Sequence, residues 1–392
     1  MDRNTAINEL SWLCTHNAYN SEGEIGTSAA STAGTNQDLS ITSQLRNGVR
    51  AFMIDVHNFH NAPRVCHGVW EFYEDLCDLL IKYKTWLNNN TNEIIILMME
   101  VANNVPATWI KDTFYGGGPI TRSDDYNLKD LLYCHPDNSS AWPTINQLVG
   151  AGKRVIVFRE TDEGKGVTGS DMEWYHDMWD YWIETPYGNS NWDDIQTHTY
   201  QLLRGNKETA SFFSLNHFVN TGYHGSGSAG FAQGMNMDDY LTARALIAWR
   251  MQACRPTLSV DFFRSLKGAK PEDTYDTVAT ANKLNEIPSI SGTISNSDGT
   301  PYLGEVVWTG VEDLNFKDNL KSDDYRVQSG SDGPGTSHPR SNNGTFSFPP
   351  NGYANNAVRP MILTPSCVGK TFTPQEVGWT GTASAKIDLK IS

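Results

Sequence analysis

Short apolar runs recur along the chain up to about residue 285, separated by longer stretches with helical spacing. Several runs are apolar throughout, without the alternation of a half-exposed strand, as "IIILMMEV" shows. Such runs are typical of strands buried on both faces, as in a parallel sheet covered by helices. The predicted strands are Leu10–Thr15, Val49–Val56, Glu93–Val101, Arg154–Arg159, Ser211–Phe218 and Thr257–Phe263.

Amphipathic segments lie between these runs, for example "EFYEDLCDLLIKYKTWLNN" and "MDDYLTARALIAWRMQA". The alternation of strands and helices predicts either a (β/α) barrel or a doubly wound sheet. A barrel of this type carries its catalytic residues at the carboxyl ends of the strands. His16 stands at such an end, in "WLCTHNAYN".

The pattern changes near Pro288, where helical spacing disappears. Hairpin-type turn signals follow in "NSDGT" and "NNGT", and "GTFSF" and "KIDLKIS" are typical of strands. We therefore expect an α/β barrel of the TIM type in residues 1–288, followed by a small all-β sandwich in residues 289–392.

Composition narrows the function classes. The formal net charge of −15 argues against nucleic acid as a partner and against simple electrostatic adsorption to acidic membranes, although a local patch would still allow adsorption. No run of 18 apolar residues is present, so no segment is expected to span a bilayer. The N-terminus has no apolar signal-peptide region in this sequence.

The six cysteines contain no CxxC pair, which disfavours a zinc or thioredoxin-type site. Cys66 and Cys77 are close enough in sequence to close a small loop, which would fit an oxidising compartment. Abundant Asn, Ser, Thr and Trp with few Lys favour the same interpretation, so we expect a secreted protein.

Polar residues interrupt the apolar pattern at the strand ends and in the loop after the second strand. They are His16, Asn17, Asp55, His67, Glu100 and Asp261. A carboxylate inside an apolar strand is costly to bury unless it is paired, so a structural role is the better explanation for any one of them. Their number shifts the balance toward a shared site. Two histidines beside Asn, Asp and Glu suit acid–base chemistry next to a hard, oxygen-ligated cation.

The ordered series "THNAYN", "NQDLSITSQLRNGVRAFMIDVH", "VCHG" and "WLNNNTNEIIILMMEV" resembles the X domain of phosphatidylinositol-specific phospholipase C, and most closely the X-domain-only phosphodiesterases. The similarity continues through "WPTINQLVGAGKRVIVF" and "PTLSVDFF", and so covers about residues 8–285. It implies an irregular TIM-type barrel. The C-terminal part resembles a transthyretin- or carboxypeptidase-regulatory-like β-sandwich.

The resemblance implies catalytic roles position by position. His16 matches the histidine that takes the proton from the inositol 2-hydroxyl group. His67 matches the general acid that protonates the departing diacylglycerol oxygen. Asp261 matches a carboxylate of the last strand that orients the first histidine.

The resemblance also implies a metal site. Asn17, Asp55 and Glu100 match positions that bind Ca²⁺ in the metal-dependent branch of the family. That branch has a Glu where this chain has Met53, so the protein supplies few oxygen ligands. Water and substrate phosphate would have to complete the coordination of Ca²⁺. The metal-independent branch has an Arg in place of Asp55, which this chain lacks. Ca²⁺ is therefore the expected cofactor.

These observations predict a secreted phospholipase C-like phosphodiesterase that cleaves phosphatidylinositol or a glycosylated relative through a cyclic phosphate. We expect a monomer that acts on a lipid or inositol phosphodiester, with peripheral contact to a membrane surface and no nucleic acid partner. Two alternatives stay open: a phosphodiesterase for another lipid or polyol headgroup, and an inactive barrel that serves as a surface-binding module. The presence of both histidines favours an active enzyme.

Other conspicuous residues have simpler interpretations. His57 is at best a partner of a catalytic group, and Arg50 is expected to be structural, at the floor of the barrel. The aromatic cluster "EWYHDMWDYW" is more typical of core or groove lining than of a cofactor site.

Overall fold

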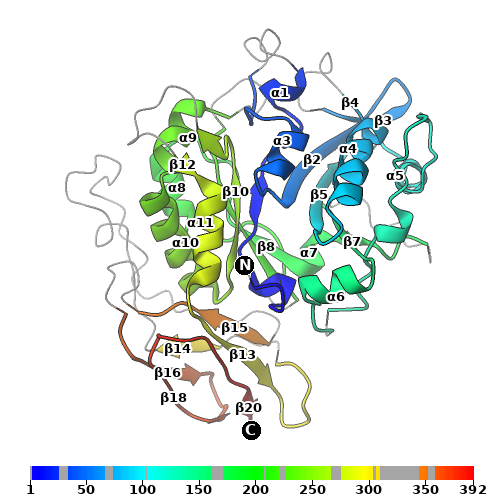
Figure 1. Ribbon diagram of the computed structural model, residues 1–392. Coiled ribbons are helices and arrows are strands. Elements are labelled where there is room, and N and C mark those ends of the chain that lie inside the picture. Colours follow the sequence, from blue (N-terminus) through cyan, green and yellow to red (C-terminus); the bar gives the residue numbers. More distant parts are fainter. Residues whose placement is uncertain are drawn as a thin grey trace.

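The computed structural model of the protein describes residues 2–25, 34–66, 74–102, 104–138, 140–160, 171–206, 209–220, 227–265, 275–302, 306–309, 344–351 and 358–392. His67 lies outside these described residues. A large unit of strands and helices comes first, and a smaller unit of strands follows it (Figure 1).

The large unit is built on a sheet whose strands follow the order β7-β6-β5-β2-β1-β10-β9-β8, and each neighbouring pair in this order is parallel. These strands are β1 (Leu13–Thr15), β2 (Ala51–Phe59), β5 (Ile95–Val101), β6 (Val155–Arg159), β7 (Tyr175–Asp177), β8 (Trp182–Glu184), β9 (Phe212–His217) and β10 (Pro256–Val260). The six predicted strands correspond to β1, β2, β5, β6, β9 and β10.

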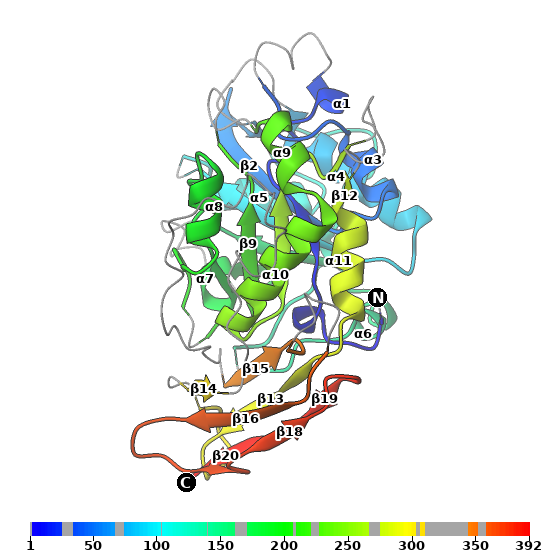
Figure 2. The same ribbon diagram turned by 90° about the vertical axis from the view of Figure 1, so that its left-hand side faces the viewer.

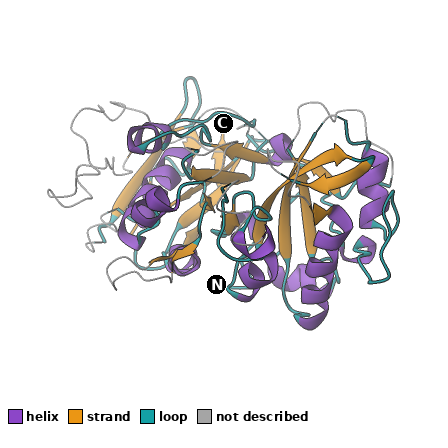
Figure 3. Cartoon of the chain, turned by 90° about the horizontal axis from the view of Figure 1, so that it is seen from above, coloured by secondary structure: helices purple, strands orange, loops and turns teal. Residues whose placement is uncertain are grey.

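Helices surround the strands, as the view from above shows (Figure 3). They are α1 (Glu22–Ile25), α3 (Ile41–Arg46), α4 (Leu76–Asn89), α5 (Ala107–Phe114), α6 (Ile145–Gly150), α7 (Met178–Tyr181), α8 (Trp192–His198), α9 (Ala229–Met235), α10 (Asp238–Gln252) and α11 (Thr277–Glu286), with short 3-10 turns at Ile7–Glu9 and Lys129–Leu131. Two small hairpins complete the unit: β3 (Ala62–Val65) with β4 (Glu74–Asp75), and β11 (Arg264–Ser265) with β12 (Tyr275–Asp276).

The core explains the continuous apolar runs. Along β5, Ile96 and Met98 pack into a cluster inside the barrel, whereas Ile95, Leu97 and Met99 pack into a second cluster against the helices. Successive strand residues point to opposite faces, so both faces must be apolar when both are covered. The structure thus confirms the predicted TIM-type barrel.

The barrel is irregular where β7 and β8 stand at the two ends of the strand order. Within the described residues no ladder joins them, and α7 links them along the chain. The sequence did not predict either strand, because three residues are too few to show a period. The aromatic cluster that contains them is largely core, as expected: Trp174 and Trp182 are buried.

The C-terminal unit consists of two small sheets around its own apolar cluster. One sheet has the order β15-β13-β20-β17 with β19 beside β13, and the other has the order β14-β16-β18. The strands are β13 (Ile290–Ser295), β14 (Val307–Thr309), β15 (Thr345–Phe348), β16 (Met361–Ser366), β17 (Phe372–Thr373), β18 (Val377–Trp379), β19 (Ala385–Lys386) and β20 (Leu389–Ile391).

The two units meet at the C-terminal end of α10, below the barrel in Figures 1 and 2. Trp249 Nε1 donates to Ser347 Oγ at 3.1 Å, and Arg250 Nη2 donates to the Pro350 carbonyl at 2.6 Å. The interface therefore lies at the amino ends of the barrel strands. The expected boundary at residue 288 falls between α11 and β13, and the independence of the two units stays a prediction.

Cys66 and Cys77 do not form the disulfide bond that their spacing would allow; both carry free, buried thiols. Cys77 lies in the first turn of α4 and packs into the apolar cluster beneath the helices, which explains its burial without a bond. None of the helices in the described ranges has the length and apolar character needed to cross a bilayer.

Candidate active site

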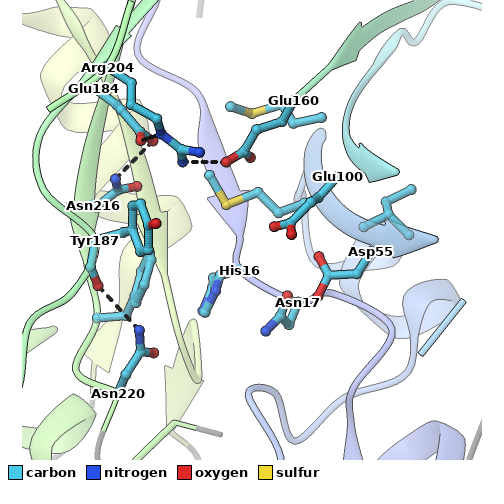
Figure 4. A pocket seen from close by; sticks show the side chains of 14 residues that line it. His16, Asn17, Asp55, Glu100, Glu160, Glu184, Tyr187, Arg204, Asn216 and Asn220 are labelled. Atoms are coloured by element: carbon cyan, nitrogen blue, oxygen red, sulfur yellow. Dashed lines mark hydrogen bonds and ion pairs between the residues drawn. The ribbon is translucent and has the colours of Figure 1, made fainter. Parts of the chain in front are cut away.

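A pocket of about 230 Å³ lies at the carboxyl ends of the barrel strands (Figure 4). Its wall includes four of the residues singled out in the sequence, namely His16, Asn17, Asp55 and Glu100. The side-chain period of a strand accounts for two of them. Asp55 follows Ala51 and Met53 on the interior face of β2, and Glu100 follows Ile96 and Met98 on the interior face of β5.

His16 directly follows β1 and is held on several sides. Its backbone N–H donates to the Val260 carbonyl at 2.9 Å, and its ring stacks on Phe218 with centroids 3.7 Å apart. Its Nδ1 atom lies 2.9 Å from Oδ1 of Asp261. A carboxylate at Nδ1 fixes the tautomer that carries its proton there, which leaves Nε2 as the proton acceptor. His16 therefore has the environment of an oriented general base.

Asp261 follows β10 and is buried behind His16. Burial raises the pKa of its carboxyl group, while His16 and a hydrogen bond from Asn36 oppose the shift. Gly227 packs so closely that a Cβ atom there would overlap the Asp261 carboxyl group. The carboxylate is therefore confined to the position from which it contacts His16.

Asn36 and Gln37 were not identified from the sequence. Asn36 Nδ2 donates to Asp261 Oδ1 at 3.1 Å, and Asn36 Oδ1 accepts from Nδ2 of Asn20 at 2.7 Å and from Nδ2 of Asn17 at 3.4 Å. Gln37 Nε2 donates to the carbonyl oxygen of His16 at 2.9 Å. Both belong to the quoted family-like series, but no periodic signal shows that this loop folds back onto β1.

The three predicted metal ligands lie around the same pocket. Asn17 adopts a left-handed conformation with φ of 44° and is buried. Asp55 and Glu100 are direct partners in the parallel ladder of β2 and β5. Burial, followed by the negative charge of Glu100, raises the pKa of Asp55 to about 7, against the effects of Tyr19 and His16. A bound cation would relieve this repulsion.

These three residues fit a hard cation, because amide and carboxylate oxygens are the ligands that Ca²⁺ prefers. Met53 lies two residues before Asp55 on the same face of β2 and also lines the pocket. Its thioether supplies no hard oxygen ligand. Three protein side chains leave most of the coordination sphere of Ca²⁺ to water and substrate.

A cluster of charged residues forms another part of the wall and was also not identified from the sequence. Arg204 Nε donates to Glu184 Oε1 at 2.5 Å, and Arg204 also pairs with Glu160. Asn216 Nδ2 donates to Glu184 Oε2 at 3.1 Å. Burial raises the pKa of Glu160 to about 8, although Arg204 opposes the shift. Glu160 directly follows β6, so the strand-end rule would have found it; Arg204 lies in a loop and carries no such signal.

The second strand and the segment after it carry the remaining candidates. Cys66, which precedes His67, donates its backbone N–H to the Asp55 carbonyl at 3.3 Å, and His67 itself lies outside the described residues. His57 is half-buried on β2, and burial lowers its pKa. Arg50 is structural as expected: its Nε atom pairs with Glu93 at 2.9 Å.

Residues 13–254, more than half of the chain, match the family model PI-PLC X 1. The chain therefore belongs to the PI-PLC X domain family. This family assignment agrees with a barrel whose polar residues gather at the carboxyl ends of its strands.

Known relatives are distant. A PI-PLC X domain-containing protein of Arabidopsis thaliana is 25% identical over 196 residues, which are 47% of this chain and 42% of that protein. An uncharacterized secreted protein of Arthroderma benhamiae is 26% identical over 157 residues, 39% of this chain and 33% of that protein. The chain thus spans less than half the length of either relative. A structure of phosphatidylinositol-specific phospholipase C from Staphylococcus aureus superposes with a TM-score of 0.49 at 17% identity, covering 73% of this chain and 96% of that one.

Proposed function

We propose that this protein is a phospholipase C-like phosphodiesterase that cleaves phosphatidylinositol by attack of a neighbouring headgroup hydroxyl on the phosphorus. The observation that carries the proposal is the His16–Asp261 pair at the edge of a pocket that also holds the oxygen ligands Asn17, Asp55 and Glu100. Membership of the PI-PLC X domain family supports phosphodiester chemistry.

In the first step, Nε2 of His16 accepts the proton of the attacking hydroxyl group while its oxygen bonds to phosphorus. Asp261 stabilises the imidazolium that forms, because its buried carboxylate lies 2.9 Å from Nδ1. Phe218 holds the ring in plane from one face. The ring is therefore oriented before the substrate arrives.

In the second step, the bond between phosphorus and the lipid oxygen breaks, and that oxygen takes a proton from His67. The products are diacylglycerol and a cyclic inositol phosphate. His16 gains one proton and His67 loses one, so both must return to their starting states before the next turnover. Water can carry the proton from His16 to His67. Alternatively, water opens the cyclic phosphate while His67 accepts a proton from that water and His16 donates its proton to the oxygen that leaves.

Asn17, Asp55 and Glu100 would hold the divalent cation. When bound, a cation of this kind neutralises negative charge on the non-bridging phosphate oxygens. Asp55 and Glu100 would otherwise repel the phosphate, since both carboxyl groups line the same pocket. A requirement for Ca²⁺ therefore belongs to the proposal.

We place the enzyme outside the cell, in contact with lipid surfaces. The composition supports this location, as does the relative described as secreted. The headgroup of a membrane lipid reaches the pocket only from the surface of the bilayer, which fits a pocket at the carboxyl ends of the barrel strands.

The direct test is the release of water-soluble phosphate from vesicles that contain labelled phosphatidylinositol, with and without a chelator. We expect release in the presence of Ca²⁺ and a strong decrease with excess chelator. The absence of release under all conditions would contradict the proposal, and release that a chelator does not change would contradict the metal requirement alone.

A further inference from the structure

His16 and Asp261 are each followed by a residue with a left-handed backbone. Asn17 has φ of 44° directly after the histidine, and Phe262 has φ of 46° directly after the aspartate. This conformation is unfavourable for residues other than glycine, least so for Asn, and it persists where surrounding contacts hold it. The contacts that hold these two turns therefore also decide how the imidazole ring and the carboxyl group face each other.

The fully buried side chain of Gln37 contacts both turns. Its Nε2 atom donates to the His16 carbonyl and to the Val260 carbonyl, at 2.9 Å in each case. Its Oε1 atom accepts the backbone N–H of Phe263 at 3.3 Å. Both N–H donors of the amide and its oxygen are thus used on backbone groups at His16 or within two residues of Asp261.

These contacts admit only one orientation of the amide. With oxygen and nitrogen exchanged, Oε1 would face two carbonyl oxygens, and the NH2 group would face the Phe263 N–H. The Val260 carbonyl also accepts the backbone N–H of His16 at 2.9 Å. Gln37 therefore joins β1 to β10 just beyond their last paired residues, Thr15 and Val260.

The segment that carries Gln37 is itself anchored. The Gln37 N–H donates to the Asn20 carbonyl at 3.2 Å, and the Gln37 carbonyl accepts the Glu22 N–H at 3.0 Å. The carbonyl of Asn36 accepts the backbone N–H of Phe262 at 2.8 Å. Because its backbone is bonded on both sides, the amide is held in place relative to both turns.

We propose that Gln37 is a positioning residue, which holds the two turns so that Nδ1 of His16 faces Oδ1 of Asp261 before substrate arrives. Its effect on turnover rests on the proposed function, whereas the geometry of the pair can be measured without substrate. Gln37 is not among the residues that line the pocket, so we expect it to act on kcat through the orientation of His16 and to leave KM nearly unchanged.

Two substitutions and a matched control test this role. Gln37→Met removes both donors and the acceptor with little change in size. Gln44 supplies the control, because it is also fully buried and has the same kind of contacts. Its Nε2 atom donates to the carbonyls of Ala18 and Leu39 at 2.7 and 2.8 Å, and its Oε1 atom accepts the Thr15 hydroxyl at 2.8 Å. Gln44→Met therefore loses three comparable hydrogen bonds and leaves those of Gln37 in place.

The first readout is nitrogen-15 NMR of the imidazole groups in the substrate-free protein, with the His16 signals assigned by comparison with His16→Asn. We expect the wild type and Gln44→Met to carry the neutral His16 proton on Nδ1. Gln37→Met should show a mixture of the two tautomers, because the carboxyl group no longer faces Nδ1 in a fixed position. In vesicle assays Gln37→Met should lower kcat by about 10- to 100-fold, with KM within about 2-fold of the wild type.

Gln37→Glu keeps the shape of the side chain and gives a second, pH-dependent readout. Its carboxylate would face two carbonyl oxygens, whereas its protonated form donates to one of them. Burial favours the protonated form, so the ratio of the variant kcat to the wild-type kcat should rise by about 5-fold or more from about pH 7.5 to about pH 5.5. This comparison decides the role even if Gln37→Met does not fold.

An unchanged His16 tautomer and kcat in Gln37→Met, or equal losses in Gln37→Met and Gln44→Met, would overturn the inference and leave the proposed function standing. A ratio for Gln37→Glu that does not change with pH would also overturn it. If the wild type turns over no lipid, the proposed function is wrong, and the tautomer measurement alone then decides whether Gln37 positions the pair.

Discussion

The Nδ1 atom of His16 lies 2.9 Å from Oδ1 of Asp261, a residue 245 positions away along the chain. The contact is made because β1 and β10 are parallel neighbours whose carboxyl ends meet: Thr15 pairs with Val260, and the two functional residues follow directly. The same strand pair thus positions the proposed base and the carboxyl group that contacts it.

Replacing Asp261 with Asn should lower kcat by roughly 10²- to 10⁴-fold, because an amide does not hold His16 in the required tautomer or stabilise its cationic form. The side chains have nearly the same shape, so the melting temperature should stay close to that of the wild type. Steady-state kinetics and thermal unfolding check both expectations. A variant that keeps more than half of the wild-type kcat would show that Asp261 does not assist His16.

Asn36 should act as a positioning residue for the same pair. Asn36→Asp would replace the donor that faces Asp261 Oδ1 with a second carboxylate. Two adjacent carboxyl groups raise the pKa of one of them, so the acidic limb of the kcat profile should move to higher pH. Asn36→Ala removes a hydrogen bond that lowers the pKa of Asp261, so it should lower kcat and move that limb in the same direction by a smaller amount. Identical pH profiles for Asn36→Asp and the wild type would argue against this role.

Two substitutions on the same face of β2 should change the affinity for Ca²⁺ in opposite directions. Asp55→Asn removes a charged ligand and should raise the Ca²⁺ concentration for half-maximal activity by about 10-fold or more, since ligand charge helps to set affinity. Met53→Glu adds an oxygen ligand on the same face and should lower that concentration. Calcium titrations of activity, with calorimetry as a direct measure of binding, check both. Unchanged titrations for the two variants would leave these residues without a metal to bind.

The buried side chain of His176 should make the free energy of unfolding depend on pH. Burial lowers the pKa of His176 to about 4, whereas an unfolded histidine titrates near its ordinary value of 6.5. The unfolded chain therefore binds the proton first, so the stability that a neutral His176 provides is lost as the pH falls from about 6.5 to about 4. The loss is about 1.4 kcal/mol per pH unit in this window, and no further loss follows below it.

Denaturant unfolding of the wild type and of His176→Gln between pH 7 and pH 4 isolates this contribution. Groups whose pKa is raised in the folded state, such as Glu160, make the folded state more stable as the pH falls. They are present in both proteins, so their contributions cancel in the difference between the two. The wild type should lose about 3 kcal/mol more than the variant over this range. Parallel stability curves would show that His176 is not buried in its neutral form.

Much of the site could be predicted because strands impose a regular rule. Apolar runs located β1, β2, β5 and β10, and the polar residue at each carboxyl end then had to lie at one mouth of the barrel. Met53 was recognised as a missing ligand from the family resemblance, and the two-residue period of β2 places it on the same face as Asp55.

The parts that were missed follow no such rule. Arg204 and Asn36 belong to loops, and their positions depend on where the chain folds back after a strand. Asn36 contacts Asp261 across 225 positions, a pairing that no local pattern encodes. β7 and β8 have three residues each, too few for their period to stand out among neighbouring aromatic residues.

The central claim is that this barrel cleaves phosphatidylinositol through a cyclic phosphate with His16 as the base. Phosphorus NMR of the water-soluble products identifies that intermediate directly. The wild type and His60→Asn, a control at an exposed turn residue outside the pocket, should both give the cyclic phosphate at similar rates. His16→Ala should lower its formation by at least about 10³-fold with the fold intact. A linear phosphate formed from the start, or a cyclic product made at the wild-type rate by His16→Ala, would contradict the account.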